Sequence, residues 1–199
     1  MKLIVLGLVT IFIGAFIAFF YPVIKAEINL YFLNHNGLRF QVDAIQTEKR
    51  QLIPNDDQFG IVINKIAANG KVQEFDVVNN NLSLEYFLQR GLVHLSDSAR
   101  PGSIGNVVII TQTSGGWYWY TRTNPEFYLI YKLMPGDVIE VFYKGERFDY
   151  IVTENSWVSE KRLENYTAAS DQKILTILSG WPPGTMMFRL VVQAKMIEQ

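Results

Sequence analysis

Residues Leu3 to Ile24 contain no charged side chain, and this run constrains the chain more than any other feature of its sequence. In a helix that rises about 1.5 Å per residue, a run of about 22 residues crosses the roughly 30 Å of a bilayer's hydrocarbon core. A cleaved signal peptide has a shorter apolar region and a small-residue cleavage site, whereas aromatic residues 19–21 stand at the exit of this run. The run therefore favours an uncleaved transmembrane anchor over residues 1–25.

The charges that flank the anchor give its orientation a slight bias. Lys2 and the amino terminus lie on one side, and Lys25 with Glu27 on the other, which slightly favours a cytoplasmic N-terminus. We therefore expect a single-pass protein of the cell membrane whose C-terminal domain is extracellular. Residues 26–54 are expected to form a stalk, in which residues 28–32 either lie at the membrane interface or simply continue the anchor helix.

Composition excludes several classes of function for the rest of the chain. Lys and Arg number 18 against 19 Asp and Glu, a net charge of -1, so no basic surface for nucleic acid is expected. The chain has no cysteine, which excludes disulfides, thiolate metal sites, iron–sulfur clusters and cysteine nucleophiles. Metal-ligand spacings, phosphate loops and dinucleotide fingerprints are also missing from the sequence, and we expect no cofactor and no bound metal.

Residues 55–199 have the pattern of a mostly β domain. Short β-branched and aromatic runs alternate with turn sequences, among them Ala68-Asn69-Gly70 and Lys144-Gly145. The predicted strands are Gly60–Ile66, Asn106–Ile110, Asp137–Tyr143, Phe148–Val152, Ile174–Leu178 and Phe188–Ala194. Ser83 and Ser159 can each cap a short connecting helix. About six to eight short strands, with helices only as connectors, favour a closed or nearly closed β-barrel.

Three segments follow one another in the order of a known family. Residues 91–109 carry a Pro-Gly turn and a Gly-Asn-Val strand, residues 127–137 lead into a hairpin, and residues 175–192 carry a strand, a Trp-Pro-Pro loop and a strand with an arginine. Together they resemble the sortase family of membrane-anchored cysteine transpeptidases, over roughly residues 59–194. The resemblance implies an eight-stranded β-barrel outside a bacterial membrane, which normally cuts a sorting signal and joins its new carboxyl end to an amine.

The resemblance also identifies the catalytic positions, and two of them are substituted. Gln112 stands where the family has its histidine, and Gly180 stands where it has its cysteine. The arginine that supports the substrate carbonyl and its oxyanion is retained as Arg189. Gly180 offers no nucleophile and Gln112 cannot transfer a proton near neutral pH. We therefore expect a protein that is inactive as a transpeptidase and binds sorting-signal-like peptides or surface-protein partners.

Ser179 leaves an alternative open, an atypical serine-dependent peptidase or transpeptidase on the same scaffold. Such an enzyme needs a base, and of the two histidines in the chain His35 lies in the stalk, which leaves His94. Strand alternation turns Ser179 away from the face of Gly180. The alternative for His94, a hydrogen-bonded structural histidine, is the interpretation we favour.

Three aromatic residues are also assigned to substrate binding, namely His94, Trp117 and Trp181. Trp117 begins four consecutive aromatics that cannot all face one core, so part of this run can form an exposed rim for a peptide, a glycan or the bilayer. Trp181 directly follows the position of the lost cysteine. Arg189 has its own alternative, an ordinary ion pair with Asp137 or Glu140. A third possibility is a structural module whose groove binds nothing.

Overall fold

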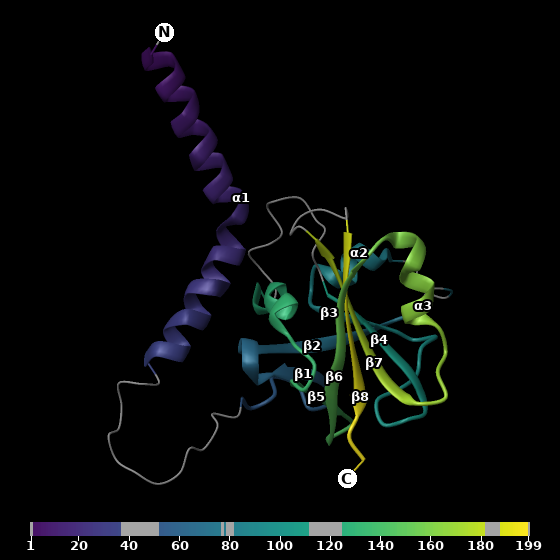
Figure 1. Cartoon of the computed structure of the whole chain (residues 1–199). Coiled ribbons are helices and arrows are strands. Elements are labelled where there is room, and N and C mark those ends of the chain that lie inside the picture. The colour runs from purple at the N-terminus through teal and green to yellow at the C-terminus, as the bar shows by residue number, and fades with distance from the viewer. Residues whose placement is uncertain are drawn as a thin grey trace, which may run out of the picture.

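The computed structural model describes residues 2–36, 52–76, 78, 82–111, 125–181 and 188–198 of the 199-residue chain. Its elements are, in chain order, α1 (Lys2–Asn36), β1 (Phe59–Ile63), η1 (Asn64–Ile66), β2 (Ala68–Phe75), α2 (Leu84–Leu88), β3 (Leu92–Leu95), β4 (Gly105–Ile110), η2 (Pro125–Lys132), β5 (Val138–Tyr143), β6 (Glu146–Val158), η3 (Glu160–Arg162), α3 (Leu163–Thr167), β7 (Lys173–Trp181) and β8 (Phe188–Met196). Figure 1 shows the long helix α1 beside a barrel of strands, with α2 and α3 on the barrel's outside.

The strands close into a barrel in the order β1-β2-β3-β4-β7-β8-β6-β5. The predicted mostly β, eight-stranded barrel with short connecting helices is confirmed. Neighbouring strands are antiparallel except for two parallel pairs, β2 with β3 and β4 with β7. Because β4 and β7 run in the same direction, their C-terminal ends lie at the same rim of the barrel.

Alternation along the strands separates an inner core from an outer apolar cluster. On β7, Leu175 and Ile177 pack in the barrel interior, whereas Leu178 belongs to a second cluster on the outer surface. This outer cluster consists of Val108, Val158, Leu178 and Val191, with Leu95, Ile110, Leu163 and Tyr166 packed against it. Leu163 and Tyr166 come from α3, so this helix covers part of the cluster. The barrel therefore has one outer face with its own apolar floor.

The turn between β5 and β6 agrees with the sequence prediction. Lys144 and Gly145 have φ values of 53° and 81°, both in the left-handed region. Two such residues in succession form the tight turn whose twist matches that of a β-hairpin. The turn joins β5 to β6, and Tyr143↔Glu146 and Phe142↔Arg147 are the first two pairs of the hairpin.

Three local predictions are wrong. β1 ends at Ile63, three residues before the predicted end, because residues 64–66 form the 3-10 helix η1. The turn is then made by Ala67, at φ 53°, so the predicted turn Ala68-Asn69-Gly70 is the start of β2. Ser83 caps α2 by accepting a hydrogen bond from the backbone of Tyr86, as expected, but the side chain of Ser159 makes no such bond to η3.

Helix α1 is bent rather than straight. Its segments Ile4–Ala18 and Val23–Leu33 meet at 63°, and Pro22, which lacks a backbone N–H, lies in the break. Within the described part of the chain no single helix is long and apolar enough to span a membrane. The two segments taken together are long and apolar enough, by length and composition alone. In the first segment Ile11 and Phe12 are 70% and 72% exposed.

The second half of α1 lies against the barrel instead of standing apart from it. Ala26 and Leu30 are buried and belong to the same apolar cluster as the barrel interior. Beside them the Glu27 carboxylate accepts hydrogen bonds from the Tyr131 hydroxyl and from the Lys132 ammonium group. Residues 26–36 of the predicted stalk are thus helical, and α1 contacts the barrel through η2.

Candidate functional site

Gly180 and Arg189 are direct partners in the β7–β8 ladder. Residues opposite each other in an antiparallel pair have Cα atoms about 4.5–5.5 Å apart, so the two positions lie side by side. Position 180 belongs to the regular ladder, which continues to the pair Trp181↔Phe188. Arg189 and the position that the resemblance assigns to the cysteine are therefore brought together.

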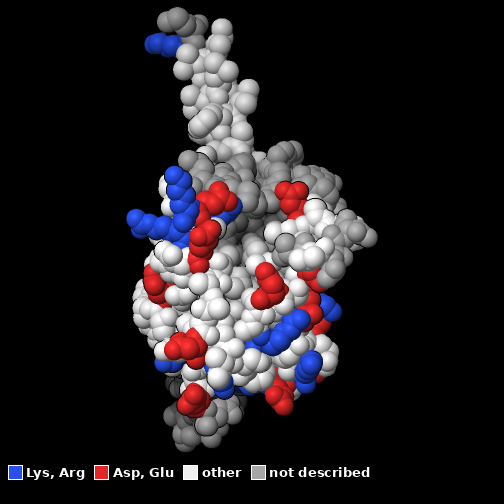
Figure 2. Space-filling model, turned by 90° about the vertical axis from the view of Figure 1, so that its right-hand side faces the viewer, with Lys and Arg blue, Asp and Glu red and all other residues white. Residues whose placement is uncertain are grey.

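Both positions lie on the outer face of the barrel. Along β8, Leu190 and Val192 pack in the barrel interior, so the alternate residues Arg189 and Val191 face outward. Val191 belongs to the outer cluster that α3 partly covers, so Arg189 adjoins that apolar floor. Charges of both signs are interspersed over the side of the barrel that carries α3 (Figure 2).

Among the described residues, Arg189 has one acidic partner. Its guanidinium forms an ion pair with Glu160 of η3, with 3.2 Å between Nη2 and Oε1. The arginine side chain is 14% exposed and the glutamate side chain 78%. The alternative partners named from the sequence were the wrong ones: Asp137 pairs with Lys65, and Glu140 with Arg147. No sequence spacing links Glu160 to Arg189, because only the course of the chain between β6 and β7 brings them together.

Ser179 faces the opposite side of the sheet from Gly180. It is 4% exposed and, as an alternate residue of the same strand, faces the barrel interior together with Leu175 and Ile177. Its partner across the ladder is Leu190, another residue of the barrel interior. A hydroxyl in this position does not share a face with Arg189.

Several predicted site residues lie outside the described residues. Gln112 and Trp117 fall between residues 111 and 125, and the side chain of Trp181 is not described. The last described residue before this gap, Thr111, donates its backbone N–H to the carbonyl of Leu178 at 2.8 Å. The end of β4 is therefore fixed to β7 two residues before Gly180.

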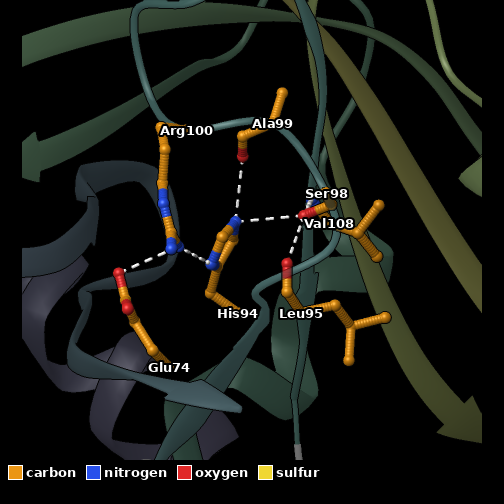
Figure 3. Close-up of polar contacts among 7 residues, drawn as sticks. All are labelled: Glu74, His94, Leu95, Ser98, Ala99, Arg100 and Val108. Atoms are coloured by element: carbon orange, nitrogen blue, oxygen red, sulfur yellow. Dashed lines mark hydrogen bonds and ion pairs between the residues drawn. The ribbon is translucent and has the colours of Figure 1, made fainter. Parts of the chain in front are cut away.

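His94 is completely buried, and both of its ring nitrogens have partners (Figure 3). Arg100 Nη1 lies 2.9 Å from Nδ1, while the Ala99 carbonyl and the Ser98 hydroxyl lie 2.9 and 3.0 Å from Nε2. Arg100 also forms an ion pair with Glu74 at 2.9 Å. A substrate could reach His94 only by displacing these contacts, and Ser179 is not among its partners.

The partners of His94 define its protonation state. A guanidinium can only donate, so Nδ1 accepts from Arg100 and Nε2 carries the proton that is directed at Ala99 and Ser98. Burial lowers the pKa of His94 from its ordinary value of 6.5, and the neighbouring Arg100 charge acts in the same direction. The ring is therefore neutral at pH 7 and works as a structural link between β3 and the turn before β4.

This arrangement predicts that the protein loses stability in mild acid. Between pH 6.5 and the lowered pKa of the folded state, the unfolded chain binds a proton that the folded His94 does not, so the free energy of unfolding falls as pH falls. Urea midpoints measured from pH 8 to pH 5 should show this slope. His94→Gln should remove it, whereas His35→Gln, which replaces the other histidine, should leave it in place. A slope that persists in His94→Gln would contradict the assignment.

The site as described offers a charged hydrogen-bond donor but no group that attacks a carbonyl. It offers a guanidinium on an outer apolar face, opposite a residue with no side chain, and a carboxylate that already pairs with that guanidinium. Among the described residues no group of three or more acidic or histidine side chains could hold a metal ion. Acyl transfer of the kind the resemblance implies needs a nucleophile and a proton donor as well as an oxyanion partner.

Comparison with known proteins identifies the barrel. Residues 61–197 match the family model described as Sortase domain, while none of the curated proteins matches the chain. Among solved structures, sortase A from Corynebacterium diphtheriae has a TM-score of 0.58 at 20% identity, covering 72% of this chain and 62% of that one. Sortase C-1 from Actinomyces oris has a TM-score of 0.60 at 18% identity, with coverages of 89% and 86%. A sortase D5 transpeptidase from Clostridium perfringens has a TM-score of 0.57 at 25% identity, with coverages of 78% and 91%. The chain thus spans less than two thirds of the Corynebacterium sortase A.

Proposed function

Because the chain belongs to the sortase family, we propose that it is a membrane-anchored member at the bacterial cell surface that no longer catalyses transpeptidation. In this proposal the site around Gly180 and Arg189 binds sorting-signal-like peptides or surface-protein partners. The single observation that carries it is the pairing of Arg189 with a glycine, in a chain without any cysteine. The oxyanion partner is retained on the scaffold while the nucleophile is missing.

The size of the lost catalysis supports inactivity. When the groups that carry covalent catalysis are removed, an oxyanion site with bound substrate retains at best about 10³–10⁴ over the reaction in water. For a peptide bond that residual rate is too low to be useful. The Ser179 alternative gains nothing from the geometry, since Ser179 faces inward and both nitrogens of His94 are engaged elsewhere.

The anchoring part of the proposal rests on α1. Its N-terminal segment exposes large apolar side chains along the helix, including Ile11 and Phe12, which is costly in water and favourable in a bilayer. The uncharged run Leu3 to Ile24 has a suitable length. A basic nucleic-acid surface is not part of the proposal, given the net charge of -1.

The full-length protein in a phospholipid nanodisc is expected to leave a sorting-signal peptide library uncleaved, as followed by mass spectrometry beside an active sortase. Retention of library members should instead depend on Arg189, so Arg189→Ala should lower it at least fivefold. Cleavage that Arg189→Ala reduces would contradict the proposal. Labelling by a fluorophosphonate that is lost in Ser179→Ala would favour the serine-dependent enzyme.

A further inference from the structure

We propose that the Arg189 site takes the free C-terminal carboxylate of a peptide rather than an internal peptide bond, and that Glu160 fills this position when no ligand is bound. The inference rests on the proposed function and specifies its ligand. It assigns the ligand class by charge, and it gives Glu160 the role of an internal competitor.

The surroundings of Arg189 call for an anion. Its side chain is only 14% exposed, and it stands on the outer face beside Val191, opposite Val158 on β6 and Gly180 on β7. None of these three neighbours carries a charge that could compensate the guanidinium. A largely covered arginine side chain loses part of the solvation of its charge, and a charged or strongly accepting group can replace it. In the described part of the chain the carboxylate of Glu160 is the group that does so.

A carboxylate matches this site better than a peptide carbonyl does. The guanidinium presents parallel N–H donors and a full positive charge, which suit two carboxylate oxygens, whereas a neutral carbonyl offers one oxygen and no charge. Gly180, directly opposite, carries no side chain that could itself pair with the guanidinium. Binding a terminal carboxylate requires no nucleophile, which is consistent with the loss of the cysteine.

Glu160 is held in a way that allows its release. Its side chain is 78% exposed and contacts Arg189 through one oxygen at 3.2 Å. Exposed ion pairs of this kind are weak, because water solvates the free carboxylate almost as well. A ligand carboxylate can therefore replace Glu160, which returns to solvent without leaving a buried charge unpaired. Because Glu160 and a ligand carboxylate bind the same guanidinium, removing the Glu160 charge should strengthen binding of the ligand.

Two libraries of random hexapeptides, identical except for a C-terminal acid or a C-terminal amide, test the inference on the full-length protein in a nanodisc. Peptides retained from the acid library are resynthesised in both forms and their dissociation constants are measured. We expect each acid to bind at least tenfold more tightly than its amide. Arg189→Gln should reduce the acid to the level of the amide.

Two glutamate variants separate competition from a general charge effect. Glu160→Gln should tighten acid binding by about two- to fivefold. Glu164→Gln removes the same charge from an exposed residue of α3 and should leave the affinity unchanged. Equal binding of acid and amide, both dependent on Arg189, would overturn this inference and leave the proposed function standing. Failure of both libraries to bind would overturn the two together, and an unchanged affinity in Glu160→Gln would remove Glu160 from the site.

Discussion

A Gly180→Cys, Gln112→His double variant is expected to capture a sorting-signal peptide covalently, as an adduct visible by intact-mass measurement, whereas the unaltered protein forms none. The new thiol would stand opposite Arg189 on the outer face, because position 180 is a regular member of the β7–β8 ladder. The resemblance places position 112 beside position 180, where an imidazole would activate the thiol and protonate the leaving amine, so that a thioester forms as the peptide bond breaks. The two groups act as a unit, and each single variant should give less than about a hundredth of the adduct.

A matched control places the same thiol on the wrong face. Ser179→Cys combined with Gln112→His adds a cysteine one residue earlier, facing the barrel interior, and should form no adduct. Circular dichroism establishes that every variant is folded. A folded Gly180→Cys, Gln112→His protein without adduct would indicate that the surroundings of position 180 have diverged along with the catalytic residues, and would direct attention to the aromatic run at Trp117.

Arg147→Met is expected to cost about 2–3 kcal/mol of the free energy of unfolding, the largest loss we predict for a residue near the surface. Arg147 pairs with Glu140 at 3.3 Å, and the Glu140 side chain is only 7% exposed. Within the described residues, Glu140 keeps one further hydrogen bond, from Asn64 at 2.8 Å, and its Oε2 atom is buried without a partner. Removing the guanidinium thus leaves the buried Glu140 carboxylate without an opposite charge among the described residues and with only the hydrogen bond from Asn64.

The reason for that loss can be tested with two further variants. Glu140→Leu added to Arg147→Met removes the uncompensated charge and should recover more than half of the lost stability. Asp149→Asn removes the other partner of Arg147, a more exposed pair at 2.6 Å, and should cost less than about 1 kcal/mol. Urea denaturation of the unaltered protein and of the three variants gives the four free energies of unfolding. A double variant as unstable as Arg147→Met alone would show that the guanidinium stabilises the barrel in another way.

The sequence predicted those strands whose apolar residues alternate or run together. β4, β5, β7 and β8 were found within a few residues of their ends because each contains a run of apolar residues that includes β-branched ones. β2 and β3 were missed. β2 has the sequence ANGKVQEF, in which Asn, Gly, Lys and Glu disfavour a strand, and pairing with β1 and β3 overrides that preference.

The candidate site was predictable only where strand pairing determines it. The neighbourhood of Gly180 and Arg189 follows from one hairpin-like pair of strands, and strand parity correctly turns Ser179 inward. The ion pair with Glu160 and the contacts of His94 depend on side chains from separate loops and strands, and one sequence contains no periodicity that relates them. The adjacency of positions 180 and 189 was thus predictable from the sequence, while the charge partners of Arg189 and His94 required the fold.

The contact between α1 and the barrel limits how far the site can search for a partner. The buried Leu30 lies six positions along the helix from Ile24, the end of the uncharged run, a rise of about 9 Å. If the apolar segment lies in a bilayer, as we propose, the flank of the barrel at η2 then borders the lipid headgroups, and the barrel cannot extend away from them on a free tether. Encounters would be confined to partners that diffuse in the same membrane or stand close above it. Confinement of this kind raises the effective concentration of a partner, so that an affinity too weak for solution would suffice at the surface.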